Sequence, residues 1–258
     1  MNTERNDTID KIQAEEYQFP YHHIPRLDDF PNFSKRWLFA PSYLAAIHLA
    51  KAWLSAQVTT HNSQHTHIDI GCGDGGFITT LKAFPDCSNI QFTGVDYDEQ
   101  AIAWAKAFSP TGTHFVCAPL SSLPQNSYDS GSLIEVLEHI PPAEIADFVD
   151  AIYQVLKPKA RLFVTVPSTE VRTHKKHYQH FNFAQLQQIF AEKFSIEECA
   201  GFDKIGLLDK LLFRLCFGKH YHFEHAYLNR LLVKLLSRTY PQLHGCGRIM
   251  LRLRKTAS

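Results

Sequence analysis

The chain has 258 residues, of which 45% are hydrophobic and 20% charged, and its 26 basic and 26 acidic side chains leave no formal net charge. This length allows one large domain or two smaller ones, and the apolar fraction excludes a largely disordered chain. No run of 18 apolar residues is present and the first sixteen residues are polar, so we expect neither a membrane-spanning helix nor a secretory signal. The six cysteines form no C-x-x-C pair, which favours reduced thiols and a cytoplasmic protein.

Strand-like and helix-like segments alternate along the middle of the chain. The predicted strands cover 65–70, 90–95, 113–117, 131–136, 161–166, 194–198 and 247–254. The predicted helices cover 42–56, 75–84, 98–108, 143–156 and 182–193, with Asn182 as the N-cap of the last. Apolar strands separated by helices predict an α/β fold, a Rossmann-like and mostly parallel sheet with helices on both faces.

The charge is distributed unevenly along the chain. Residues 1–200 hold 15 basic and 23 acidic side chains, whereas residues 201–258 hold 11 and 3. Two leucine-rich amphipathic helices are predicted within 203–240, inside this basic part. The basic part could contact phosphates, an acidic lipid surface or an anionic substrate, or it could dock on the acidic part of its own chain.

The strongest motif is the run HIDIGCGDGG at residues 67–76, in which a strand leads through glycines into a helix. Glycines allow the backbone to adopt positive φ and to approach a ligand closely, and the helix start offers unpaired N–H groups. Asp96 ends the next strand, 23 residues after Gly73. Its carboxylate could accept hydrogen bonds from both ribose hydroxyls of a nucleoside cofactor, or alternatively cap the helix that follows.

Asp69 helps to decide which cofactor this loop would bind. A dinucleotide-binding loop would read G-x-G-x-x-G, and this loop does not. A carboxylate beside the turn would repel a pyrophosphate but attract an amino-acid ammonium. This disfavours a nicotinamide-dependent dehydrogenase.

The run resembles motif I, D/E-x-G-x-G-x-G, of class I S-adenosylmethionine-dependent methyltransferases. The resemblance covers about residues 65–200 and continues in order through GVDYDEQAIAWAKAF, SLPQNSYDSGSLIEVLEHIPP and VLKPKARLFVTVPS. It implies a seven-stranded sheet whose last strand, 247–254, is antiparallel. It also implies an S-adenosylmethionine-binding core at 61–202, an N-terminal lid or helical extension at 1–60, a helical insertion or lid at 203–245, and the final strand at 246–258.

The resemblance also implies a set of cofactor-binding residues. Asp69, Gly71 and Gly73 would contact the methionine part, Asp96 the ribose, and Tyr97 the adenine. The complete predicted set is Asp69, Gly71, Cys72, Gly73, Asp74, Gly75, Asp96, Tyr97, Ala118, Pro119, Leu120 and Glu135. Pro119 stands where the family often has an acidic residue that binds the adenine amino group. The backbone of Ala118 and Leu120 could replace it; a non-catalytic S-adenosylmethionine-binding module is the alternative.

Acidic and histidine side chains follow the fourth and fifth strands, whose carboxyl ends meet at one edge of the sheet. His139, His177 and Glu135 are the predicted catalytic residues, with His139 as a general base or a wall of the acceptor pocket. Packing at a strand-to-helix turn is the alternative for His139. In the motif H-K-K-H-Y-Q-H, three histidines would share one face if the segment were helical.

The sequence E-V-L-E-H also resembles the E-x-x-E-H of small-RNA 3′-terminal 2′-O-methyltransferases and of ubiquinone-pathway O-methyltransferases. The resemblance implies a divalent cation, Mg or Mn, held by Glu135, Glu138, His139 and His180. Because the chain contains 15 histidines, such clusters also arise by chance.

These observations predict an S-adenosylmethionine-dependent methyltransferase that methylates oxygen on a small or lipid-linked acceptor. The alternatives are a metal-assisted 2′-O-methyltransferase of RNA ends or a quinol O-methyltransferase, and the non-catalytic module. Tyr21, His22, His23 and Trp37 could enclose the acceptor. The basic C-terminal helices could touch a membrane, and RNA is a less favoured partner.

Overall fold

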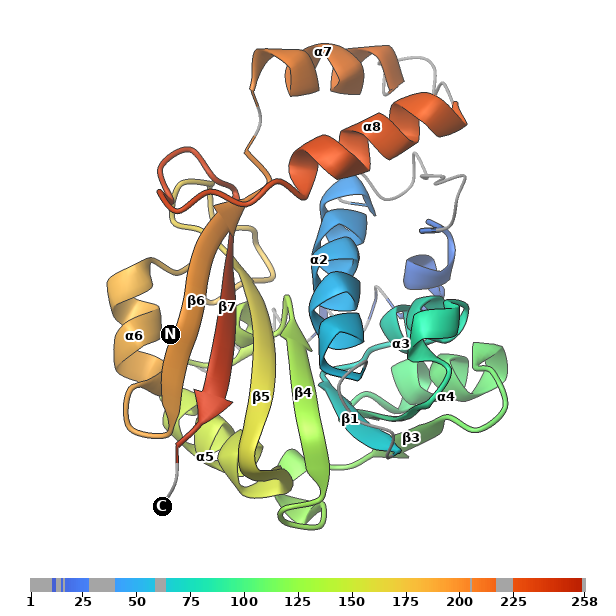
Figure 1. Cartoon of the computed structure of the whole chain (residues 1–258), viewed down its shortest axis with the longest axis vertical. Coiled ribbons are helices and arrows are strands. Elements are labelled where there is room, and N and C mark those ends of the chain that lie inside the picture. The colour runs from blue at the N-terminus through green and yellow to red at the C-terminus, as the bar shows by residue number, and fades with distance from the viewer. Residues whose placement is uncertain are drawn as a thin grey trace.

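A single seven-stranded sheet organises the protein (Figure 1). The computed structural model describes residues 11–12, 15, 17–27, 40–58, 64–204, 206–216 and 225–256. The strands are β1 (His65–Ile70), β2 (Ile90–Asp96), β3 (His114–Cys117), β4 (Tyr128–Ile134), β5 (Leu156–Pro167), β6 (Phe194–Phe202) and β7 (Arg248–Lys255). They lie in the order β3-β2-β1-β4-β5-β7-β6, and β7 runs antiparallel to both of its neighbours while the other pairs are parallel. The predicted fold class is confirmed.

Helices cover both faces of this sheet, as expected for strands that are apolar along their length. The α-helices are α2 (Ala40–Val58), α3 (Gly76–Lys82), α4 (Glu99–Phe108), α5 (Ile145–Val155), α6 (Phe183–Phe190), α7 (Leu207–Cys216) and α8 (Ala226–Leu236). Short 3-10 turns are η1 (Tyr21–His23), η2 (Pro85–Cys87), η3 (Leu120–Ser122) and η4 (Leu137–His139). Among the described residues, no helix has both the length and the apolar character needed to cross a membrane.

Two hydrophobic cores hold the layers together. One core joins α2, α3, α7 and α8 to one sheet face, with Phe92, Phe163 and Phe202 fully buried in it. The other joins α5 and α6 to the opposite face, around residues such as Phe181 and Phe190. Helix α2, from the predicted N-terminal extension, is thus a packed layer of the fold, and α8 lies across its end (Figure 1).

Most predicted elements form where the sequence places them, and the differences have local causes. Strand β4 ends at Ile134 instead of residue 136, because Glu135 adopts a φ of 56° that leaves the extended region. Helix α6 begins after Asn182, whose side chain accepts a hydrogen bond from the Gln185 amide in a capping box, as predicted. The segment 174–180 is not helical, although His177 still lies against both His174 and His180.

Candidate cofactor and acceptor site

The carboxyl ends of the central parallel strands open into a cavity of about 1030 Å³. This volume is at the upper end of what small-molecule sites occupy, which leaves room for a cofactor and a second ligand. The walls come from the ends of β1, β2 and β4, the loops after β3 and β5, the N-terminal segment and the start of β7. Of the predicted cofactor residues, those that line it are Asp69, Gly71, Cys72, Asp96, Tyr97, Ala118, Pro119, Leu120 and Glu135.

The glycine-rich turn after β1 depends on the absence of side chains. Gly71 has a φ of 70°, and a Cβ atom built on it would lie 2.6 Å from a methyl group of Val136. Its amide donates a 2.8 Å hydrogen bond to the carbonyl of Val95, as does the Cys72 amide at 3.1 Å. The turn is therefore clamped between β2 and the end of β4, and its backbone lies at the cavity wall.

A chain of hydrogen bonds orients the Asp69 carboxylate. The parallel register places His67 beside Ser130 and Asp69 beside Ser132. The Ser132 hydroxyl donates to Asp69 Oδ1 at 2.6 Å, and His67 joins Ser132 at 3.0 Å to Ser130 at 2.7 Å. Because the Ser132 proton goes to Asp69, the proton of His67 lies on Nε2 and points to Ser132.

The electrostatics of the hydrogen-bonded residues His67, Ser132 and Asp69 suit a cationic ligand. Burial lowers the pKa of His67 to about 3, so its ring is neutral at physiological pH. Burial also raises the pKa of Asp69 to about 7, against the Ser132 hydrogen bond and with a contribution from the charge of Asp96. An ammonium group that entered the cavity beside Asp69 would favour the ionised carboxylate and replace the solvation lost on burial.

Asp96, at the end of β2, braces the glycine-rich turn from the other side. Its Oδ2 accepts a 2.9 Å hydrogen bond from the Gly73 amide, and its Oδ1 accepts one from the Asp98 amide at 3.0 Å. The helix cap of α4 is Asp98, which accepts from the Ala101 amide at 2.8 Å. Asp96 is therefore not the helix cap, and its carboxylate is held at the cavity wall, where it could accept ribose hydroxyls.

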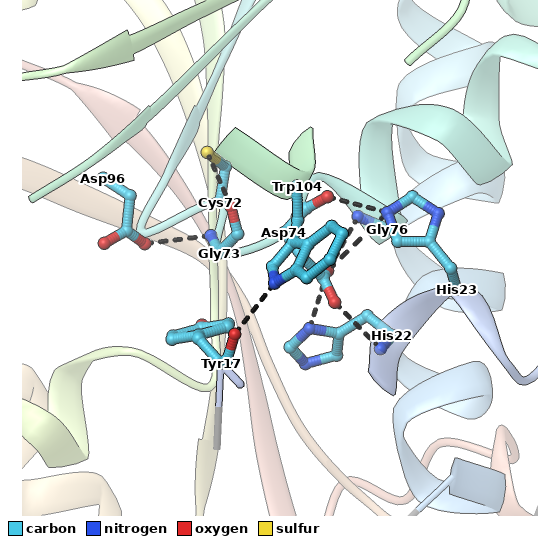
Figure 2. A network of polar contacts seen from close by, with 9 residues as sticks. All are labelled: Tyr17, His22, His23, Cys72, Gly73, Asp74, Gly76, Asp96 and Trp104. Atoms are coloured by element: carbon cyan, nitrogen blue, oxygen red, sulfur yellow. Dashed lines mark hydrogen bonds and ion pairs between the residues drawn. The ribbon is translucent and has the colours of Figure 1, made fainter. Parts of the chain in front are cut away.

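The Asp74 side chain is turned away from the cavity. Its carboxylate accepts hydrogen bonds from His22, at 3.0 Å from the amide and 2.9 Å from Nδ1, while its carbonyl bonds His23 Nε2 at 2.7 Å (Figure 2). Burial would raise the pKa of Asp74, but the charge and hydrogen bonds of His22 outweigh it and lower that pKa. Asp74 therefore fastens the N-terminal segment to the glycine-rich turn.

The same segment places Tyr17 over the glycine-rich turn. A Cβ atom on Gly73 would lie 2.5 Å from the Tyr17 hydroxyl oxygen, and Trp104 Nε1 donates to the Tyr17 carbonyl at 2.8 Å (Figure 2). Tyr17, Tyr21 and His22 line the cavity. Trp37, which the sequence analysis also proposed as a wall, lies outside the described residues.

The predicted adenine end lies at the mouth of the cavity. Tyr97 is 65% exposed there, and Pro119 precedes the turn η3. The Ala118 amide donates to the Asp96 carbonyl at 3.1 Å, so it is engaged in holding the loop after β3. The Ala118 amide is therefore not free to bind adenine, and no acidic side chain stands at position 119.

A buried acid and histidine cluster lies farther along the cavity. Glu138, His139 and His177 each offer one ligand atom, and these atoms lie within 4.8 Å of one another. Burial lowers the pKa of His139 to about 3 and that of His177 to about 2, and burial together with Glu135 raises the pKa of Glu138 well above its ordinary value. Within the described part of the chain, Glu138 Oε2 and His139 Nδ1 are buried and have no hydrogen-bond partner. The cluster therefore holds two neutral imidazoles, a carboxyl group whose ionisation is disfavoured, and two polar atoms without partners among the described residues.

His180 holds the His177 ring of this cluster in place by a hydrogen bond. His180 Nδ1 lies 3.0 Å from the Val171 carbonyl oxygen, and His180 Nε2 lies 2.9 Å from His177 Nδ1. Because a carbonyl only accepts, His180 donates through Nδ1 and accepts the proton of His177 Nδ1 through Nε2. This leaves the lone pair of His177 on Nε2. His177 thus occupies the place in the cluster that the sequence analysis gave to His180.

Glu135 pairs with an arginine from the last strand. Its Oε2 accepts a 2.9 Å hydrogen bond from Arg248 Nε, and Arg248 Nη1 also pairs with Asp203. Burial alone would lower the pKa of Arg248, but the two carboxylates outweigh it and raise that pKa. Arg248 reaches the carboxyl edge of the sheet because β7 is antiparallel and begins there. No local motif in the sequence signals this pairing, because the two residues are 113 positions apart.

Comparisons with known proteins agree with this geometry. A family model described as a methyltransferase domain matches residues 68–164, the stretch that holds the glycine-rich turn, Asp96 and the E-V-L-E-H motif. A solved S-adenosylmethionine-dependent methyltransferase from Archaeoglobus fulgidus is 19% identical, with a TM-score of 0.55 over 81% of this chain and 94% of that one. Magnesium protoporphyrin IX methyltransferase from Synechocystis PCC 6803, solved with bound S-adenosylmethionine, is 18% identical, with a TM-score of 0.55 over 84% and 82%.

A third similar structure is the 1,6-didemethyltoxoflavin-N1-methyltransferase of Burkholderia thailandensis, 17% identical, with a TM-score of 0.53 over 82% of this chain and 79% of that one. At these identities, the structural likeness defines the fold and not the acceptor. Together with the family model, it identifies the class I S-adenosylmethionine-dependent methyltransferase fold. Residues 68–164 match a methyltransferase domain, and the solved structures share its fold.

Proposed function

We propose that this protein transfers a methyl group from S-adenosylmethionine to an oxygen of a small or lipid-linked acceptor. One observation carries the proposal. One end of the cavity has the glycine-rich turn and the carboxyl groups of Asp69 and Asp96, and the other end has the buried neutral imidazoles of His139 and His177. The first end suits the amino acid and ribose of the cofactor, and the second suits an uncharged hydroxyl.

The cofactor brings an activated methyl group. The protein therefore has to bind the cofactor and the acceptor, align them, and exclude water. Asp69 would hold the ammonium and Asp96 the ribose hydroxyls, while the clamped turn provides a rigid wall. Tyr17 and His22 cover the turn and are themselves fixed by Trp104 and Asp74. The reacting groups would therefore meet in a site closed off by the protein's own N-terminal segment.

The acceptor end favours an uncharged hydroxyl on an apolar body. A neutral imidazole at His139 or His177 can accept the proton of such a hydroxyl as a hydrogen bond. Aromatic and aliphatic side chains from three parts of the chain, Tyr43, Ile140, Phe148 and Phe213, line the same cavity. Burial lowers the pKa of both imidazoles, so they stay neutral and can orient an acceptor hydroxyl by accepting its hydrogen bond, but they are poorly suited to removing its proton.

The test is an acceptor screen that measures S-adenosylhomocysteine formed from S-adenosylmethionine. Matched phenols, quinols and their amine analogues would be compared, with Asp96→Ala as the inactive control. We expect turnover with hydroxyl acceptors and little with the amines. Turnover confined to amines would contradict oxygen methylation, and cofactor binding without turnover on any acceptor would favour a non-catalytic module.

A second candidate function is metal-assisted methylation, of RNA ends or of a quinol. The observation that favours it is the buried cluster of Glu138, His139 and His177, in which two polar atoms have no partner among the residues that the structure describes. The donor set, one carboxylate and two neutral imidazoles, fits a divalent cation such as Mn or Mg, and His180 would fix the His177 ring as such sites require. A bound cation would lower the pKa of the acceptor hydroxyl.

Chelation decides between the two mechanisms. If a cation assists, EDTA should abolish activity and Mg or Mn should restore it. In that case His177→Ala should also abolish Mn binding measured by calorimetry, while His114→Ala, at an exposed histidine on β3, should not. Full activity in EDTA would overturn the metal-assisted mechanism and leave the metal-independent one.

A further inference from the structure

Helices α7 and α8 expose a row of apolar side chains. Leu207, Leu211 and Leu215 follow one another at four-residue spacing on α7 and are 88%, 55% and 47% exposed. Tyr227 and Leu231, also four residues apart, are exposed on α8. Residues at this spacing lie on one helix face, about 6 Å apart along the axis. We call these five residues the leucine surface.

The leucine surface is not needed to hold the helices in place. Helix α8 packs into the first core through Leu232, Val233, Leu235 and Leu236, and α7 contributes Leu212 to the same core. The exposed rows lie on the other faces. Of the ten large apolar side chains exposed in the described part of the chain, five are on these two short helices, so exposed apolar area is concentrated there rather than scattered.

Basic residues flank the leucine surface. Lys210 and Arg214 are exposed on α7, and Arg230 and Lys234 are exposed on α8. The sequence from 206 to 238 carries six Lys and Arg residues against two acidic ones. Apolar rows bordered by cations match the interface of an anionic bilayer, where leucines enter the acyl boundary and cations meet the headgroups.

This charge pattern distinguishes between possible occupants. A symmetric contact with a second copy would bring the same cations of both chains together, at an electrostatic cost. RNA phosphates would bind the cations, but RNA would leave the leucines exposed to water. An anionic lipid surface satisfies both features.

We propose that α7 and α8 form an interfacial surface that docks the protein on anionic lipid. Both helices lie at one end of the molecule, with α7 outermost beyond α8 (Figure 1). Phe213, on α7, lines the cavity. Docking would therefore place the acceptor end of the cavity near the bilayer. The proposal itself does not depend on methyl transfer.

The test is flotation of the whole protein with vesicles of phosphatidylcholine alone or mixed with phosphatidylglycerol. We expect at least tenfold stronger partitioning to the anionic vesicles, with most of the binding lost in 0.5 M salt. The double variant Leu207→Gln/Leu211→Gln should reduce partitioning at least tenfold, and Lys234→Gln about fivefold. The matched controls Phe183→Gln, on α6, and Lys106→Gln, on α4, should bind like the unmodified protein.

Equal binding to both vesicle types or unchanged binding of the double variant would overturn the proposal. A concentration-dependent dimer that the double variant abolishes, without any lipid binding, would overturn it too. RNA binding that Lys234→Gln weakens but the leucine variant does not would also assign the surface to another partner. Calorimetric binding of S-adenosylhomocysteine is measured on every variant; unchanged affinity shows that the fold is intact and keeps this test separate from that of the proposed function.

Discussion

The two ends of the cavity differ in how far apart along the chain their residues lie. At the cofactor end, Asp69, Asp96 and Pro119 come from three successive strand-to-helix junctions of neighbouring strands. At the acceptor end, His139 and His177 come from different loops, and Arg248 comes from the last strand. The sheet topology brings these three junctions together. The acceptor end is assembled from distant segments, so acceptor preference can change while the fold and cofactor site persist.

The ends also differ in charge. The cofactor end holds Asp69 and Asp96, whose pKa values are raised mainly by burial. A ligand that brings positive charge or hydrogen-bond donors would therefore stabilise their ionised forms. The acceptor end is occupied by neutral imidazoles and by Glu138, whose pKa is raised by burial and by the charge of Glu135, which disfavours its ionised form. This end therefore suits an uncharged group, or a cation that stabilises the ionised form of Glu138.

The largest effect should follow loss of the ribose carboxylate. Asp96→Ala removes a charged acceptor and also frees the Gly73 amide, so cofactor affinity should fall at least a hundredfold, the equivalent of two charged hydrogen bonds of about 1.5 kcal/mol each. Calorimetry with S-adenosylhomocysteine measures this. Asp98→Ala is the matched control, because Asp98 caps α4 outside the cavity. It should cost about 1 kcal/mol of stability and leave affinity unchanged. Equal losses in both variants would refute the ribose assignment.

A smaller effect should appear in the pH dependence of binding. Asp69 has a pKa of about 7 in the free protein, and a bound ammonium favours its ionised form. Affinity is therefore fully present only well above pH 7, is about half lost at pH 7, and falls by about twentyfold between pH 7.5 and 5.5. Titrations of S-adenosylhomocysteine across this range measure it. Asp69→Asn should bind weakly and without this slope; a slope that survives the substitution would assign it to another group.

The smallest effect should come from the hydrogen-bond chain behind Asp69. Ser132→Ala removes the donor to Asp69 Oδ1, which stabilises the ionised form. The pKa of Asp69 should rise further, and affinity at pH 7 should fall about fivefold while recovering at higher pH. Recovery at high pH separates this result from general damage to the site. A loss that is the same at every pH would show that Ser132 does not act through the charge of Asp69.

The same contrast explains what the sequence could predict. The glycine-rich turn, Asp69 and Asp96 are readable because a strand, a turn and a helix follow one another within a few residues, and parallel topology brings such junctions together. The orientation of the Asp74 side chain could not be predicted from the sequence, because it is set by a hydrogen bond to His22, 52 residues away. The pairing of Glu135 with Arg248 spans 113 residues and depends on β7 being antiparallel.

The choice between His177 and His180 shows the same limit at short range. Both fit a histidine ligand pattern, and only the Val171 carbonyl, which takes the proton of His180 Nδ1, decides which ring faces the cluster. Such a contact depends on the path of an irregular loop, which no periodicity describes. Local motifs therefore predict the cofactor end, and tertiary contacts decide the acceptor end.

The most direct measurement is calorimetric titration of the purified protein with S-adenosylmethionine and S-adenosylhomocysteine, with NAD as the control. The cavity predicts one site per chain with micromolar affinity for both compounds and no heat with NAD. Absence of binding to either compound, or comparable binding of NAD, would contradict the assignment of the glycine-rich turn, Asp69 and Asp96 to an S-adenosylmethionine site.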